Sequence, residues 1–255
     1  MLFDILSELR RRGHSVRIQQ GLSRRVSADV AVLHVDATTT PADYIEYASR
    51  FAFCLNLGAA DISKRRISGA LVDKGDTWQG PVIVKSNLNN QGIPEAFLNR
   101  QSQRAGKPQP FPDMPVQEPY AVHGSIDDVP QTIFDRSDLI VEKFIPETEP
   151  DGYAARFWVF CGDRERCTRY VSPKQLIKAS DTIRREAVPV PDQLRVLRQR
   201  LGFDYGKFDF VMHEGRAVLL DANKTPGRPS KLMKMFAAGA SDLADGFEGL
   251  IRRAG

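Results

Sequence analysis

The chain has 255 residues, of which 42% are hydrophobic and 27% charged, and this composition is that of an ordinary globular protein with a sizeable core. The 36 basic and 32 acidic residues give a formal net charge of +4, and the basic clusters are spread along the chain among acids. No apolar run approaches the ~20 residues that span a bilayer, and the first residues lack the pattern of a signal peptide. We therefore expect a cytoplasmic protein without a membrane partner, and the charge pattern does not favour a nucleic-acid partner.

The few cysteines and histidines exclude two further classes. Cys54, Cys161 and Cys167 are too few for a disulfide framework and form no Cys-x-x-Cys pair, so we expect small apolar residues in or near strands. The four histidines are scattered without the spacing of metal ligands. Neither a disulfide-rich fold nor a zinc site is predicted.

Residues 1–60 alternate between helical and extended patterns. Apolar residues at helical spacing predict a helix over 2–12, and Pro41 opens a second helix that runs to 51. Short strands are predicted at 16–18, 29–34 and 53–55. This alternation is typical of a small parallel α/β unit, and the unit is truncated because a first strand is missing.

Residues 61–140 are predicted to form a small lobe. A basic helix is expected over 61–72, and an apolar strand at 81–84 ends in Lys85. After a polar loop at 86–92, a helix is expected over 94–104. The five prolines between 106 and 119 predict a loop. A helix over 128–134 and an apolar strand at 139–141 complete this part.

Residues 141–255 change to antiparallel hairpins and are predicted to form a large lobe. Strands at 154–161 and 166–171 flank the turn Gly162-Asp163, and a second hairpin covers 207–223. Helices are expected over 191–201 and 230–253. The predicted fold is therefore α/β (α+β), with two lobes built on antiparallel sheets after the small parallel unit.

The second hairpin has an acidic residue on each strand. If its turn closes symmetrically about Gly215, Asp209 lies opposite Asp221 with their Cβ atoms ~5 Å apart. Such a pair is destabilising unless a cation or a proton separates the charges. Mg²⁺ usually takes one or two carboxylates, and Asn223 would add a neutral oxygen in line with Asp221. A two-residue turn at Glu214-Gly215 would instead shift the register and send the acids to opposite faces. The hairpin alone does not decide between these alternatives.

Three other segments carry candidate functional residues. Lys85 ends an apolar strand, where it could contact a phosphate or could be a solvated strand end. Arg156 shares a strand face with Trp158 and Phe160, which suits either an anionic ligand or a salt bridge. The segment 142–145 could connect two lobes and present backbone groups to a flat base. No glycine-rich dinucleotide, Walker or Gly-x-Ser-x-Gly pattern occurs in the chain.

Taken in order, these segments resemble the ATP-grasp superfamily of carboxylate ligases. Residues 81–85 are similar to its phosphate-binding strand, and 141–145 are similar to the adenine-binding hinge of biotin carboxylases. Residues 153–160 are similar to the arginine strand of the ribosomal-protein glutamate ligases. The most specific part is 206–227, which is similar to the closing metal motif with its acids, asparagine and Pro-Gly. With Asn56 and Lys64, the resemblance covers residues 54 to 227.

The resemblance implies that ATP, with Mg²⁺ or Mn²⁺, binds between two lobes. It assigns the site in three groups of residues: nucleotide binding to Lys64, Lys85, Glu142, Lys143 and Phe144, metal binding to Asp209, Asp221 and Asn223, and catalysis to Arg156 and Arg169. The backbone groups of Glu142 and Phe144 would hold the adenine.

The reaction implied by the resemblance is carboxylate activation. A substrate carboxylate attacks the γ-phosphate, and an amine or thiol displaces the resulting acyl phosphate, so small carboxylate and amine substrates are the expected partners. Two alternatives are a small-molecule kinase on the same fold and an ATP-binding protein without catalysis. The loop 86–92 contains one glycine where the family has a glycine-rich lid, and this favours the second alternative. The sequence leaves open whether the protein forms a homodimer.

Overall fold

The computed structural model describes residues 1–22, 24–115, 119–177, 179–227 and 233–254. Its helices and short 3-10 turns, in chain order, are α1 (Leu2–Arg11), α2 (Ala42–Ala48), α3 (Lys64–Ile67), η1 (Asn89–Gly92), α4 (Ile93–Arg104), η2 (Ile126–Asp128), α5 (Gln131–Phe134), η3 (Ala179–Asp181), α6 (Asp192–Arg200) and α7 (Met233–Ala254). Among the described residues, no helix is both long enough and apolar enough to cross a bilayer.

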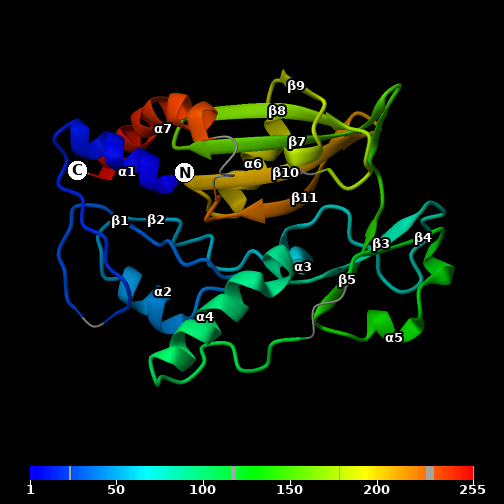
Figure 1. Cartoon of the computed structure of the whole chain (residues 1–255), viewed down its shortest axis with the longest axis horizontal. Helices are drawn as coiled ribbons and strands as arrows, with labels where there is room; N and C mark the ends of the chain where they lie inside the picture. The colour runs from blue at the N-terminus through cyan, green and yellow to red at the C-terminus, as the bar shows by residue number, and fades with distance from the viewer. Residues whose placement is uncertain (23, 116–118, 178, 228–232, 255) are drawn as a thin grey trace.

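The strands form three separate sheets (Figure 1). A parallel pair consists of β1 (Ala31–Val32) and β2 (Cys54–Leu55). An antiparallel sheet of order β4-β3-β5 consists of β3 (Val82–Ser86), β4 (Ala121–His123) and β5 (Leu139–Lys143). A larger sheet of order β11-β10-β7-β8-β9, to which β6 adds beside β7, consists of β6 (Glu147–Glu149), β7 (Gly152–Cys161), β8 (Arg164–Ser172), β9 (Arg184–Ala187), β10 (Tyr205–His213) and β11 (Arg216–Asn223).

The N-terminal part confirms the parallel pair, with Ala31 opposite Cys54. The predicted strand at 16–18 is wrong, and the strand predicted at 29–34 has only two residues. Helix α1 was predicted correctly, but it packs against α7 of the C-terminal part, since Ile5 and Phe247 share one buried cluster. The first and last helices of the described chain therefore lie side by side (Figure 1).

The helix predicted over 61–72 is a single turn, α3. Residues after Ile67 leave the helix because their backbone groups pair with other elements. The Gly69 N–H donates to the Leu219 carbonyl oxygen at 2.8 Å, and the Val72 N–H donates to that of Val141 at 2.9 Å. Tertiary pairing overrides the local helical pattern here. Strands β4, β6 and β9 were not predicted.

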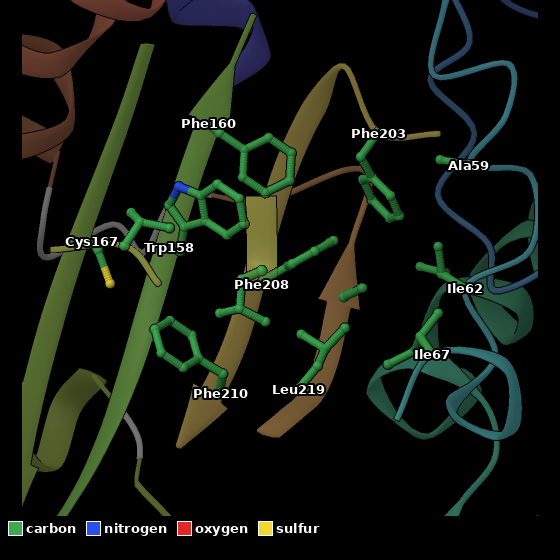
Figure 2. Packing of buried hydrophobic residues seen from close by; sticks show 13 residues of the cluster. Ala59, Ile62, Ile67, Trp158, Phe160, Cys167, Phe203, Phe208, Phe210 and Leu219 are labelled. Atoms are coloured by element: carbon green, nitrogen blue, oxygen red, sulfur yellow. The ribbon is translucent and has the colours of Figure 1, made fainter. Parts of the chain in front are cut away.

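The core of the larger sheet is aromatic. Trp158 and Phe160 of β7 and Phe208 and Phe210 of β10 are fully buried, and the Phe160 and Phe208 ring centroids are 5.1 Å apart at 88°. Figure 2 shows these side chains together with Leu219 on the same face of the sheet. Each buried ring contributes about 1.5–3 kcal/mol of burial free energy. Because side chains alternate along a strand, Asp209 must point to the opposite face.

Candidate functional site

The acidic hairpin reaches the predicted register by a different route. Its turn has two central residues, Glu214 (φ 49°) and Gly215 (φ 76°), and His213 pairs with Arg216. With that register alone, Asp209 and Asp221 would point to opposite faces of the hairpin. A β-bulge follows between Asp209 and Phe210. It shifts the pairing by one residue, so Asp209 lies opposite Asp221. The predicted symmetric turn is therefore wrong, and the predicted facing of the two acids is confirmed.

Both acids lie on the face of the sheet that is opposite to the aromatic core. Their side chains are 23% (Asp209) and 29% (Asp221) exposed. The buried Asp221 Oδ1 accepts no hydrogen bond from any described residue. Burial raises the pKa of Asp209, a neighbouring lysine lowers it, and Asp221 raises it, with a net rise. Two carboxylates that share a site in this way need a positive partner.

Two lysines supply positive charge beside the acids. The Lys64 side chain is buried, and its Nζ donates to the Leu88 carbonyl oxygen at 2.8 Å and lies 3.5 Å from Asp221 Oδ1. Lys207 Nζ lies 2.9 Å from Asp209 Oδ1. Burial lowers the pKa of Lys207, but Asp209, with smaller contributions from Asp221 and Tyr170, raises it, and the net shift is upward. Lys207 was not among the residues predicted from the sequence, although its position two residues before Asp209 on one strand face was a signal.

Lys85 is paired with a carboxylate in the three-stranded sheet. Its Nζ forms a close ion pair with Glu142 Oε2, and the Glu142 side chain is completely buried. Tyr120, which the sequence analysis also missed, lies within electrostatic reach of this pair and of Asp221. Burial raises the pKa of Tyr120, with Lys85 opposing and Asp221 and Glu142 adding to the rise. The structure thus brings Lys64, Lys85 and both acids to one region.

The predicted hinge connects the two antiparallel sheets. The Lys143 N–H donates to the Ala70 carbonyl oxygen and the Phe144 N–H to that of Pro81, each at 2.8 Å. Phe144 lines a pocket of about 470 Å³ together with Trp78, Tyr153 and His213, among others. His213 lies four residues from Asp209 on β10, which is ~13 Å along a strand. The hinge pocket and the acids therefore lie at two ends of one strand face.

The predicted catalytic arginines lie elsewhere. Arg156 and Arg169 are opposite each other on β7 and β8, and their Nε atoms donate to Glu147 at 2.8 and 3.1 Å. Arg169 also pairs with Glu149 and Glu186. Burial raises the pKa of Glu147, but Arg156 and further donors outweigh it, and the net shift is downward. Arg156 pairs with Phe210, so alternation places it on the core face, opposite to Asp209.

The residues on the acidic face fit a hydrated magnesium ion. In residues 1–22, 24–115, 119–177, 179–227 and 233–254, no group of three or more His, Cys, Asp and Glu side chains is placed to hold a metal. Mg²⁺ does not need such a group, because it commonly keeps several waters and binds one or two carboxylates. Asp221 Oδ1, which is buried and accepts no hydrogen bond from the described part of the chain, is a suitable ligand. Asn223 Oδ1 already accepts the Thr225 N–H at 2.8 Å and has a second lone pair.

A small antiparallel sheet, a hinge strand and a larger antiparallel sheet that ends in the acidic hairpin together define the ATP-grasp fold. Comparison with solved structures shows this fold over nearly the whole chain. No protein-family model matches the sequence, and no curated protein matches it.

Three solved structures illustrate the similarity. The RimK domain ATP-grasp protein of Sphaerobacter thermophilus DSM 20745 is 16% identical, with a TM-score of 0.50 over 96% of this chain and 93% of that chain. The D-alanine–D-alanine ligase of Bacillus anthracis is 14% identical, with a TM-score of 0.51 over 98% and 91%. The ATP-grasp ligase PsnB with a minimal precursor is 13% identical, with a TM-score of 0.53 over 97% and 94%. At these identities the similarity concerns the fold.

Proposed function

We propose that the chain binds ATP with Mg²⁺ between its small and large lobes and acts as a carboxylate–amine ligase. The proposed division is a small α/β unit over 1–60, a small lobe over 61–140 and a large lobe over 141–255. The ATP-grasp fold supports the proposal, as does a similar structure, PsnB, which was solved with Mg and ADP. The observation that carries it is the facing of Asp209 and Asp221 across a bulged hairpin, on the face away from the core.

In this proposal, residues from several elements have separate roles in binding the nucleotide and the cation. Asp209 and Asp221, with Asn223, hold the cation, and Lys64 and Lys85 contact phosphates. Phe144 lines the proposed base pocket, and Glu142 and Lys143 precede it on the hinge strand. Lys64 is well suited, because its ammonium group is fixed by the Leu88 carbonyl oxygen while it stays 3.5 Å from Asp221 Oδ1. A fixed cation needs no reorganisation when negative charge develops beside it.

Bound MgATP would supply an electrophilic γ-phosphoryl group to a substrate carboxylate, and an amine or thiol would displace the phosphate from the resulting acyl phosphate. The chain contributes position and charge to this chemistry. Lys207 is a candidate for the charge role that the family resemblance implied for Arg156 and Arg169, since it lies on the acidic face 2.9 Å from Asp209 Oδ1. The substrates would be a small carboxylic acid and an amine.

The test is thermal unfolding with ATP, with and without Mg²⁺. At ~100 times the dissociation constant, a ligand stabilises the native state by about 2.7 kcal/mol. We expect Asp209→Asn and Asp221→Asn to remove the magnesium-dependent part of the shift. Asp163→Asn, in the exposed turn between β7 and β8, is the matched control and should keep it. If neither ATP nor MgATP stabilises the wild-type protein, the proposal is wrong.

A second candidate function is nucleotide binding without catalysis. Arg156 and Arg169 are bound by Glu147 and lie on the core face of the sheet, so the acidic face lacks both predicted arginines. ADP release measured with a panel of amino acids and small acids separates the two functions. A ligase releases ADP only when a suitable acid is present. A silent binder shows the thermal shift and releases no ADP with any of them.

A further inference from the structure

The segment 36–40, between β1 and α2, contacts both sides of the proposed cation site. Thr38 and Thr40 are 1% and 2% exposed, although their side chains are polar. Buried polar groups are nearly always hydrogen-bonded, so their partners show what the segment holds. These partners belong to the segment just after β11 on one side and to the segment 89–95, which comprises η1 and the start of α4, on the other.

On the first side, the segment anchors the residues that follow Asn223. Lys224 is 2% exposed, and its Nζ donates to Thr40 Oγ1 at 2.7 Å and to the Ala60 carbonyl oxygen at 2.8 Å. Leaving either of these buried groups unpaired would be costly. The end of β11 is therefore tied to the N-terminal α/β unit directly beyond the proposed metal ligand.

Thr225 carries the connection to the amide of Asn223. Its N–H donates to Asn223 Oδ1 at 2.8 Å, and its Oγ1 lies 2.6 Å from Asp36 Oδ1 and 3.3 Å from Asn223 Oδ1. A hydroxyl has one proton to donate, and Thr225 donates it to the closer, charged Asp36 carboxylate. Asp36 thus holds Thr225 in place. The Thr225 N–H, by donating to Asn223 Oδ1, in turn holds the Asn223 amide in one orientation.

On the second side, the segment holds the loop that orients Lys64. The Thr38 N–H donates to Glu95 Oε1 at 2.6 Å, and Thr38 Oγ1 accepts the Asn89 N–H at 2.8 Å. The neighbouring Leu88 carbonyl oxygen accepts Lys64 Nζ. One short segment therefore sets the position of an oxygen ligand and of a phosphate-binding lysine.

We infer that Asp36 and Thr225 are positioning residues for the cation, acting through the amide of Asn223. The inference rests on the proposed function, because it requires that Asn223 binds the cation. It gives the N-terminal unit a role at the site beyond packing. Partners that orient a ligand in this way typically change metal affinity by about 10–100-fold when they are removed.

The experiment measures Mn²⁺ affinity by electron paramagnetic resonance in the presence of ATP, and ATP affinity without metal, for T225V, T225S, D36A and the double variant D36A/T225V. We expect about a 10-fold loss of Mn²⁺ affinity in T225V and in D36A. The double variant should lose no more than either single variant, because both act on one contact. T225S keeps the hydroxyl and should bind Mn²⁺ as the wild type does. T132V, on exposed α5, is the control.

The outcomes separate this inference from the proposed function. If the wild-type protein binds no Mn²⁺ with ATP, the proposed function fails and the inference fails with it. If the wild type binds Mn²⁺ and both T225V and D36A bind it equally well, only the inference is overturned. It is also overturned if these variants lose metal-free ATP affinity and melting temperature in the same proportion as Mn²⁺ affinity, because that pattern indicates general destabilisation.

Discussion

At the scale of single residues, the buried ion pair of Lys85 and Glu142 shows how function and stability overlap. The Glu142 carboxylate is completely buried, so its charge depends on Lys85 for compensation. Removing one partner of such a pair leaves an uncompensated buried charge, whereas replacing both with apolar residues of similar volume is often neutral. A single Lys85 variant would therefore test folding as well as phosphate binding.

We predict that K85M lowers the free energy of unfolding by about 3 kcal/mol and that K85M/E142M recovers most of this loss. Urea unfolding measures both values. K74M, at an exposed position before β3, is the control and should change stability by no more than about 0.5 kcal/mol. Equal destabilisation in the single and double variants would show that the pair does not have this role. Loss of ATP binding in the stable double variant would then report on the Lys85–Glu142 pair, separately from any effect on folding.

The sequence pointed to both Lys85 and Glu142 as functional candidates but did not predict that they form an ion pair with each other. Lys85 and Glu142 were each recognisable from an apolar strand that ends in a charged residue. Their mutual ion pair depends on the antiparallel register of β3 and β5, in which Lys85 lies opposite Ile140 and Glu142 opposite Ile83. No local pattern encodes that register, because the two strands are separated by more than 50 residues of other elements.

At the scale of elements, the β10–β11 hairpin combines a tight turn with a bulge. The positive φ of Glu214 and Gly215 is that of a hairpin turn for which Asn-Gly is the preferred pair. The sequence predicted the two strands and which residues share a face of each, since alternation is local, but whether the two acids face each other depended on the turn. It did not predict the bulge, because an extra residue in β11 is defined only by its partner strand. The structure does not place Arg156 on the acidic face, and the reason is again strand alternation. Arg156 and Trp158 are two residues apart on β7, so both belong to the core face.

We predict that E214N stabilises the protein by up to about 1 kcal/mol, because asparagine tolerates the left-handed backbone better than glutamate. G215A should destabilise it by a similar amount, since alanine is strained at φ 76° although the space around Gly215 is open. Denaturant midpoints of the two variants check this. Shifts in the same direction would contradict the role of backbone conformation in this turn.

At the scale of the whole molecule, charged residues join the first helix to the last. Arg12 of the α1 C-terminus binds Glu8 at 3.0 Å, and it also binds Asp245 of α7 at 2.7 Å. Hydrogen bonds from Arg11, and then from Arg12, lower the pKa of Glu8 from 4.5 to about 2. A carboxylate with a depressed native pKa adds stability above its unfolded pKa and loses it as the pH falls through the folded value.

We therefore predict that wild-type protein and E8Q differ most in unfolding midpoint above pH 4.5 and converge as the pH falls toward 2. Urea titrations at a series of pH values measure this difference. E46Q, at an exposed position on α2, should follow the wild-type profile. A constant offset between E8Q and wild type across the series would show that the effect of Glu8 does not depend on its charge.

Side chains of β10 alternate between the core and the acidic face, so insertions and deletions of single residues in this strand should not be tolerated. Phe208 and Phe210 fill the core while Asp209 points the other way, so one codon gained or lost early in this strand would turn phenyl rings outward and carboxylate inward. The described part of the proline-rich stretch before β4 carries no such constraint. Over evolutionary time, length variation should therefore be absent from 205–210 and common around 106–112, a pattern that sequencing of related genes can reveal.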